Sequence, residues 1–152
     1  MLIRQALEAV AEFHRHIGEV VASAPNLLDG SPERAGRLAG ELRSLGTGYR
    51  DCADPLIRRA LLAIEELCEW LEAHQQESRV EALDAAADRL FVLLGDVVAT
   101  GLPVEEAFRI VASSNLSKQA GQRSSAGKGI KAEGFEDPKR QLAQLLNGSE
   151  TP

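Results

Sequence analysis

The sequence has few aromatic residues and few prolines. Aromatic side chains make up 4% of the 152 residues, with a single Trp and a single Tyr, and there are six prolines. Folds rich in β-sheet normally use more aromatic and β-branched residues, so this scarcity argues against a β-sandwich or barrel. Hydrophobic residues nevertheless reach 44% of the chain. A chain of this length can bury one core, and we expect a single all-α domain spanning residues 1–152.

The chain also has few cysteines, lacks long uninterrupted apolar runs and carries no net positive charge. The two cysteines, Cys52 and Cys68, are too few for a disulfide framework. Glu8 and Glu12 interrupt the N-terminal apolar segment, and Asp96 interrupts the most apolar later one, so we expect no export signal and no membrane span. The net charge of -6 disfavours nucleic-acid polymers and membrane surfaces as partners. These features together predict a cytoplasmic protein.

Helical periodicity is present in five segments, and no segment shows the alternation typical of a strand. Ser31, Asp54 and Ser78 are placed as N-caps of three of the helices. The expected helices cover residues 2–22, 32–46, 55–76, 79–100 and 103–115, and Pro138 starts a last short helix. We expect an antiparallel bundle of four to six helices, with 55–76 and 79–100 at its centre. Residues 118–136 are rich in Gly, Ser and Lys and are expected to form a tail segment without periodicity.

Two neighbouring helices place acidic residues beside their apolar stripes. In "AIEELCEWLEA", residues 63–73, the acidic residues are Glu65, Glu66, Glu69 and Glu72. In the next helix, Glu81, Asp84 and Asp88 border an expected core stripe of Val80, Leu83, Ala87, Leu90, Phe91, Leu94 and Val98. The short connection predicts antiparallel packing that brings the acidic edges together. Two carboxylates 4 Å apart would repel by about 4 kcal/mol at an effective dielectric of about 20, and a bound cation would remove that penalty.

The residue types favour Mg²⁺ over a transition metal. Carboxylate oxygens are the ligands that Mg²⁺ prefers, and the ion commonly shares them with substrate phosphates. His14, His16 and His74 are too scattered along the chain to form a ligand set. An ordinary solvated acidic face remains the alternative interpretation of the carboxylate rows.

Several segments match one family in their order and spacing. "EELCE" at 65–69 fits an EExxE helix motif. The other segments are "EFHRHIG" at 12–18, "RRALLAIEELCEWLEA" at 58–73, "DAAADRLFVLLGDVVATGLPVEEAF" at 84–108, "SNLSK" at 114–118 and "GKGIKAEGFEDP" at 127–138. This set resembles the all-α nucleoside triphosphate pyrophosphohydrolases, which include MazG-like enzymes, dimeric dUTPases and phosphoribosyl-ATP pyrophosphohydrolases. The resemblance is to the phosphoribosyl-ATP pyrophosphohydrolase-like branch in particular.

The second acidic motif departs from the usual ExxD pattern of that superfamily. Aligning on "DRLFVLLG" places the aspartate at Asp88 and the glutamate at Ala85. The missing carboxylate would come from Asp84, one turn before Asp88, with Glu81 as the alternative.

The resemblance implies a reaction, a cofactor and a set of site residues. It implies Mg²⁺-dependent hydrolysis of the α–β phosphoanhydride of a nucleoside triphosphate, with Mn²⁺ as a possible substitute, in a homodimer or a dimer of dimers. The implied metal ligands are Glu65, Glu66, Glu69, Asp84 and Asp88, and Glu65 and Glu69 are also the implied catalytic residues. The implied substrate contacts are His14, Asn115, Lys118, Lys128 and Lys131. For Asn115 the alternative is a helix C-cap, and for the lysines a solvated tail.

Three functions remain open at this point. The first is house-cleaning of the nucleotide pool, acting on dUTP or on aberrant deoxynucleotides. The second is phosphoribosyl-ATP pyrophosphohydrolysis in histidine biosynthesis. The third is a non-catalytic helical dimer that binds nucleotides, and Ala85 at the usual glutamate position is the observation that favours it.

Overall fold

The computed structural model describes residues 3–49, 51 and 53–149, and the chain forms two compact units. The central unit is Ala24–Gly101, and the terminal unit combines Met1–Ser23 with Leu102–Pro152. Cys52, one of the two cysteines, lies outside the described residues. Of the described residues, Cys68 is a buried free cysteine.

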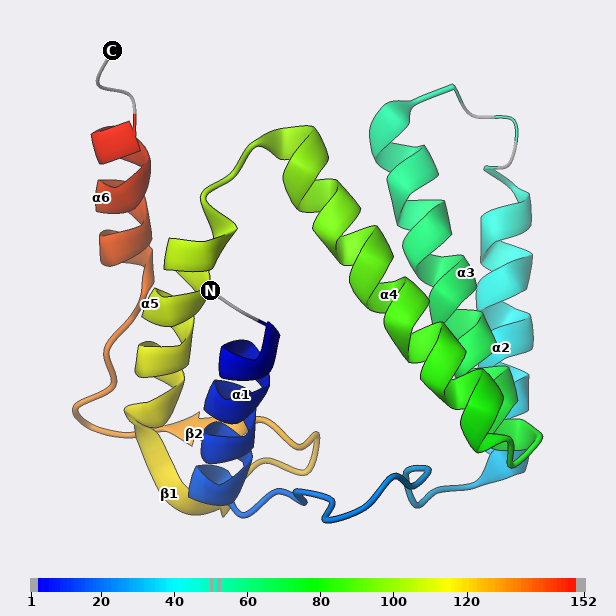
Figure 1. The fold of residues 1–152 in the computed structure, drawn as a ribbon, viewed down its shortest axis with the longest axis horizontal. Helices are drawn as coiled ribbons and strands as arrows, with labels where there is room; N and C mark the ends of the chain where they lie inside the picture. Colours follow the sequence, from blue (N-terminus) through cyan, green and yellow to red (C-terminus); the bar gives the residue numbers. More distant parts are fainter. Residues whose placement is uncertain (1–2, 50, 52, 150–152) are drawn as a thin grey trace. The chain divides into compact units, whose positions relative to one another are not determined.

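The central unit is a three-helix layer made of α2 (Pro32–Thr47), α3 (Pro55–Gln75) and α4 (Arg79–Thr100). α3 packs against both of the other helices and lies between them (Figure 1). The three predicted N-caps are confirmed, because Ser31, Asp54 and Ser78 each accept a hydrogen bond from a backbone N–H in the first turn. These caps satisfy donors that the helix itself leaves free. The sequence therefore specified the starts of all three helices.

Small side chains let these helices approach closely. Ala39 on α2 and Cys68 on α3 are both fully buried, and the Cys68 Sγ lies 3.5 Å from the Ala39 carbonyl oxygen. Ala73 on α3 and Ala85 on α4 are also buried, with 2% and 3% of their surface exposed. Burial raises the pKa of the Cys68 thiol, so this side chain stays a neutral core residue. The close α3–α4 contact is what brings the acidic residues of the two helices together.

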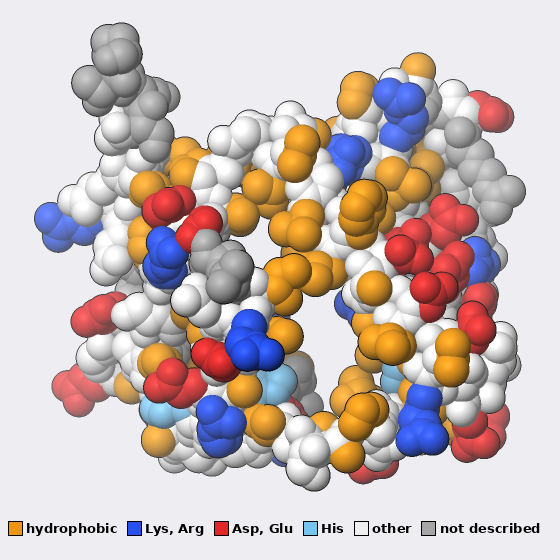
Figure 2. Space-filling model, in the orientation of Figure 1, with side chains coloured by type: hydrophobic (Ala, Val, Ile, Leu, Met, Phe, Trp, Pro, Cys, Tyr) orange, Lys and Arg blue, Asp and Glu red, His pale blue; other side chains and the backbone are white. Residues whose placement is uncertain are grey.

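The core stripe predicted for α4 is wrong. Val80, Leu83, Phe91 and Val98 are 73–84% exposed, whereas the buried residues of α4 are Ala82 and Ala85. Figure 2 shows hydrophobic side chains lying open along this helix. The helix has apolar residues on more than one side, and periodicity alone does not reveal which side packs on α3. Here the side with the smallest residues makes the contact.

The terminal unit contains α1 (Ile3–Ile17), α5 (Val104–Leu116), a hairpin of β1 (Lys118–Arg123) and β2 (Gly129–Lys131), and α6 (Lys139–Ser149). α5 packs against α1 and α6, and β1 packs against α1 (Figure 1). α1 ends earlier than the predicted residue 22, because Gly18 takes a positive φ of 74°. That left-handed conformation ends helices and favours glycine, which has no Cβ to clash.

Two short strands replace the irregular tail expected after Lys118. β1 and β2 pair antiparallel, with Lys118 opposite Lys131. The fold remains all-α as predicted, since the described residues otherwise form six helices. None of those helices has the length and the hydropathy that a membrane crossing requires.

Candidate active site

Several of the predicted acidic residues of α3 and α4 line a common cavity. One cavity, of about 350 Å³, is lined by four carboxylates and one guanidinium among polar and small residues: Arg43, Glu69, Glu72, Ala73, Gln76, Glu81, Asp84 and Ala85. A second, of about 410 Å³, is lined by Arg43, Gly46, Leu61, Ile64, Glu65 and Cys68. Figure 2 shows acidic side chains gathered on the central unit. We use the name acidic cleft for these two cavities together with the neighbouring Glu66 of α3 and Asp88 of α4.

Glu66 is the most constrained carboxylate of the acidic cleft. Its Oε2 is buried and has no hydrogen-bond partner among the described residues. Burial raises the pKa of Glu66, and the negative charges of Glu69, Asp88, Glu65 and Asp84 raise it further. A buried carboxylate oxygen without a partner is costly, so this atom is suited to a cation that the protein alone does not provide.

The alanine at the usual glutamate position has a packing role. Ala85 is buried against α3 and lines the same cavity as Asp84 and Glu81. Of these two candidates for the missing carboxylate, Asp84 contributes to the raised pKa of Glu66, whereas Glu81 is not among the causes. Asp84 thus stays the predicted partner of Asp88, with Glu81 as the alternative.

The carboxylates fit a hard divalent cation in their chemistry. The donors are all oxygens, one is buried and unpaired, and their mutual repulsion favours a positive charge between them. In the side-chain positions of the described residues, however, no group of three or more His, Cys, Asp or Glu side chains is arranged to hold a metal ion. The metal site therefore stays a prediction.

A guanidinium from outside the motifs lies at the edge of the acidic cleft. Arg43 on α2 donates from Nε and Nη2 to the two carboxylate oxygens of Glu72, both at 2.9 Å. This paired hydrogen bond lowers the pKa of Glu72 and raises that of Arg43, so both stay charged. Motif reasoning missed Arg43 because the pairing crosses from one helix to another. Arg43 follows Ala39 by one helical turn, but the burial of Ala39 is seen only in the structure.

The terminal unit brings together two of the predicted substrate contacts. The Lys118 Nζ donates to the Asn115 Oδ1 at 2.8 Å and lies 5.3 Å from the centre of the Phe13 ring. His16 donates from Nε2 to the Lys118 carbonyl oxygen at 2.7 Å, which fixes the start of β1. A side chain at Gly129 would crowd Lys118, so this glycine keeps the path of the lysine open.

The other three predicted substrate contacts are more dispersed. Lys131 is opposite Lys118 in the hairpin, and its Nζ lies 4.7 Å from the centre of the Phe135 ring. Lys128 is at the hairpin turn, where its backbone N–H donates to the Ser124 Oγ. The His14 Nδ1 lies 3.1 Å from the Val20 carbonyl oxygen. The structure thus brings Asn115 and Lys118 together and places Lys131 opposite Lys118 in the hairpin.

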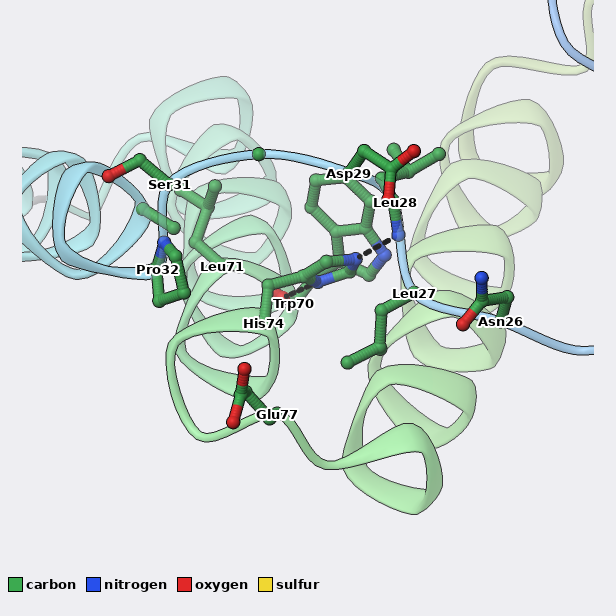
Figure 3. Close-up of a pocket in the computed structure, with 12 residues that line it drawn as sticks. Asn26, Leu27, Leu28, Asp29, Ser31, Pro32, Trp70, Leu71, His74 and Glu77 are labelled. Carbon is green, nitrogen blue, oxygen red and sulfur yellow. Dashed lines mark hydrogen bonds between the residues drawn. The ribbon is translucent and has the colours of Figure 1, made fainter.

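A further cavity of about 470 Å³ lies on the central unit, between α3 and the segment 26–32 (Figure 3). The ring of His74 lies 4.3 Å from that of Trp70, and the Arg89 guanidinium is 4.9 Å from the centre of the Trp70 ring. His74 donates from Nδ1 to the Trp70 carbonyl oxygen and accepts from the Leu28 N–H at Nε2. Trp70 is therefore packed by groups of its own chain.

The segment with α3, α4 and most of α5 matches a known family model. Residues 49–115 match the family model of phosphoribosyl-ATP pyrophosphohydrolase. This segment is therefore similar to the phosphoribosyl-ATP pyrophosphohydrolases of the MazG-like superfamily. The match confirms the resemblance and includes every predicted metal ligand from Glu65 to Asp88. No curated protein and no solved structure gives a significant match.

The family match gives the acidic cleft a chemical context. Phosphoribosyl-ATP pyrophosphohydrolases are hydrolases that act on acid anhydrides, so the similarity supports pyrophosphohydrolysis as the class of reaction. The matched segment covers α3, α4 and most of α5. The match begins after Arg43 and ends before Lys118. The role of Lys118 is therefore implied by the resemblance alone, and Arg43 is identified from the structure alone.

Proposed function

We propose that this protein hydrolyses the α–β phosphoanhydride of a nucleoside or deoxynucleoside triphosphate, giving a nucleoside monophosphate and pyrophosphate. The observation that carries the proposal is the buried, unpaired Glu66 Oε2 among the opposed carboxylates of α3 and α4. It lies within the segment that matches a pyrophosphohydrolase family. A structural helix contact gains nothing from such an arrangement, because each carboxylate raises the cost of keeping its neighbours charged.

The carboxylates divide into two roles in this proposal. Glu66, Glu69, Asp84 and Asp88 would hold Mg²⁺, or Mn²⁺ in its place, and Glu65 contributes to the same charge cluster. A divalent ion bound there would neutralise charge on the phosphate oxygens. Glu65 would orient the attacking water and accept its proton, with Glu69 as the second catalytic carboxylate. No covalent nucleophile is needed for this chemistry.

We further propose that His14, Asn115, Lys118, Lys128 and Lys131 contact the substrate. The hydrogen bond between Asn115 and Lys118 supports a shared role, because an amide that holds a lysine ammonium fixes where its charge is presented. For the assembly we propose a cytoplasmic homodimer or dimer of dimers. The exposed Phe91 and Val98 on α4 support burial against another surface.

A product-resolved substrate screen tests this function. Canonical and modified triphosphates, including dUTP, and phosphoribosyl-ATP are each incubated with the protein and Mg²⁺, and the products are separated by ion-exchange chromatography. We expect pyrophosphate and a nucleoside monophosphate from at least one triphosphate, and none in EDTA. Orthophosphate as the released product would contradict the proposal. Turnover of phosphoribosyl-ATP alone would favour the histidine-biosynthesis alternative, and metal binding without turnover of any compound would favour the non-catalytic one.

A further inference from the structure

Arg43 is held in place by a carboxylate that the proposed chemistry does not use. Glu72 accepts two hydrogen bonds from Arg43, at Nε and Nη2, in a bidentate pair. Such a pair fixes the plane of the guanidinium as well as its position. The support comes from the helix contact below it, where Ala39 and Cys68 are buried one turn before Arg43 and Glu72.

The anchored guanidinium still has donors to offer. An arginine has five N–H donors, and the pair with Glu72 uses two of them. Nη1 makes no hydrogen bond to any residue that the structure describes. The Arg43 side chain is 39% exposed, so a ligand can reach this edge.

Arg43 also lines both cavities of the acidic cleft. It faces Glu65 in one cavity, and Glu69 and Asp84 in the other. It is the only cation among the described residues that line either cavity. A polyphosphate brought to these carboxylates needs N–H donors for those of its oxygens that a cation does not bind, and a guanidinium edge matches a phosphate in geometry.

We infer that Arg43 binds a phosphate of the substrate through its Nη1 edge, with Glu72 as the residue that positions it. The inference rests on the proposed function, since it assigns a new contact to the same acidic cleft. Arg43 lies on α2, outside the family-matched residues 49–115. The inferred phosphate contact therefore rests on the packing of α2 against α3 in this structure and not on the family match.

Lysine and glutamine substitutions of Arg43 test the inference. Arg43→Lys keeps the charge and loses the planar fork, and Arg43→Gln loses both. The probe is inorganic tripolyphosphate with Mg²⁺, titrated into the full chain by calorimetry, because this measurement requires neither a nucleobase nor turnover. We expect both variants to bind the probe about tenfold more weakly or worse, which is the range for a hydrogen bond to a charged group. With a substrate from the screen, the KM should rise more than kcat falls.

Arg59→Lys is the matched control. Arg59 also pairs across two helices, with Asp96, and its side chain is similarly exposed at 33%, yet it lines neither of the two cavities. We expect Arg59→Lys to bind tripolyphosphate as the wild type does. Glu72→Gln should weaken binding less than Arg43→Gln, because the donor remains but is no longer held.

The outcomes separate this inference from the proposed function. If Arg43→Gln binds tripolyphosphate as tightly as the wild type, or if the wild type does not bind it, the inference is wrong. Arg43-dependent binding by a protein that releases no pyrophosphate would instead uphold the phosphate contact and overturn the proposed reaction. A fall in unfolding temperature with unchanged binding would show that Arg43 is a structural counter-ion only.

Discussion

The carboxylates of the acidic cleft differ in their partners, and this difference separates their roles. Glu72 is paired with Arg43 and has a lowered pKa, whereas Glu66 has a buried unpaired oxygen and a raised pKa. Glu72 therefore contributes to folding in the charged form, and Glu66 opposes folding in that form. Two glutamates six residues apart on one helix thus act in opposite directions on stability.

The Arg43–Glu72 pair predicts a pH-dependent stability difference. The pKa of Glu72 is lowered in the folded state, so its contribution is complete above its unfolded pKa of about 4.3 and is lost as the pH falls through the folded pKa. Glu72→Gln should cost about 0.5–1 kcal/mol at pH 7 in urea unfolding, the range for a partly exposed pair. The cost should be smaller at pH 3 than at pH 7, because it is lost as Glu72 becomes protonated in the folded state.

Glu41→Gln is the control for this measurement. Glu41 lies on the same helix as Arg43 and is exposed. Its substitution should leave stability unchanged at both pH values. A cost of Glu72→Gln that is equal at pH 7 and pH 3 would show that the ion pair is not its source.

Gly129 predicts a second effect at the scale of one residue. A Cβ there would lie 2.9 Å from the Lys118 Cδ, 3.2 Å from the Ile17 Cγ2 and 3.3 Å from the Phe13 Cζ. Gly129→Ala should therefore destabilise the terminal unit by about 1–2 kcal/mol, as overpacking does, and push Lys118 away from Asn115. Gly134→Ala is the control, because no heavy atom lies within 4 Å of its Cβ position. Urea unfolding that gives the two variants equal stability would contradict this account of Gly129.

The sequence predicted the acidic side chains but not how each is paired. The EExxE spacing places Glu65, Glu66 and Glu69 on one helix, and the capped antiparallel neighbour supplies Asp88. The burial of Glu66 and the pairing of Glu72 depend on how closely α2 and α4 approach α3. That distance is set by small buried residues, which carry no chemical signal of their own in a single sequence.

At the scale of elements, the helix starts followed from local chemistry and the strands did not. Ser31, Asp54 and Ser78 cap their helices as expected, because a side-chain oxygen next to the first turn acts locally. β1 lacks alternating hydrophobicity. It is positioned instead by contacts with distant residues, such as the His16 hydrogen bond to the Lys118 carbonyl. Such contacts across the chain cannot be read from a short window.

The contact between α2 and α3 predicts the effect of an enlarged core residue. Ala39 has no exposed surface and lies against Cys68. Ala39→Leu should destabilise the central unit by about 1–3 kcal/mol, because the surrounding helices leave no room for the added carbons. Ala60→Leu is the control, since Ala60 is exposed on α3. If urea unfolding shows Ala39→Leu to be as stable as the wild type, the close packing of these helices is wrong.

At the scale of the molecule, the residues predicted for the site lie in two compact units. The central unit contains all the predicted metal ligands, and the terminal unit contains all five predicted substrate contacts. Residues 24–101 form the central unit, and the segments before and after them form the terminal unit. The sequence motifs therefore lie in both units.

The open apolar side chains of α4 predict association between copies of the chain. Phe91 is 76% exposed and Val98 is 84% exposed. Light scattering should give a mass of at least twice the 16.4 kDa chain. The double substitution Phe91→Ser with Val98→Ser should lower that mass, because it removes apolar area from the interface. Arg79→Ser, on the exposed start of the same helix, should not, and a wild-type mass of 16.4 kDa would contradict the prediction.

The central claim is that the opposed carboxylates of α3 and α4 serve catalysis at the expense of stability. The most direct test compares pyrophosphate release by the wild type and by Glu66→Gln in Mg²⁺, together with the unfolding temperature of both in EDTA. We predict a loss of activity of roughly hundredfold or more. The unfolding temperature of Glu66→Gln should be equal to or higher than that of the wild type, because a buried unpaired charge has been removed. Full activity in Glu66→Gln, or a lower unfolding temperature in EDTA, would contradict the account.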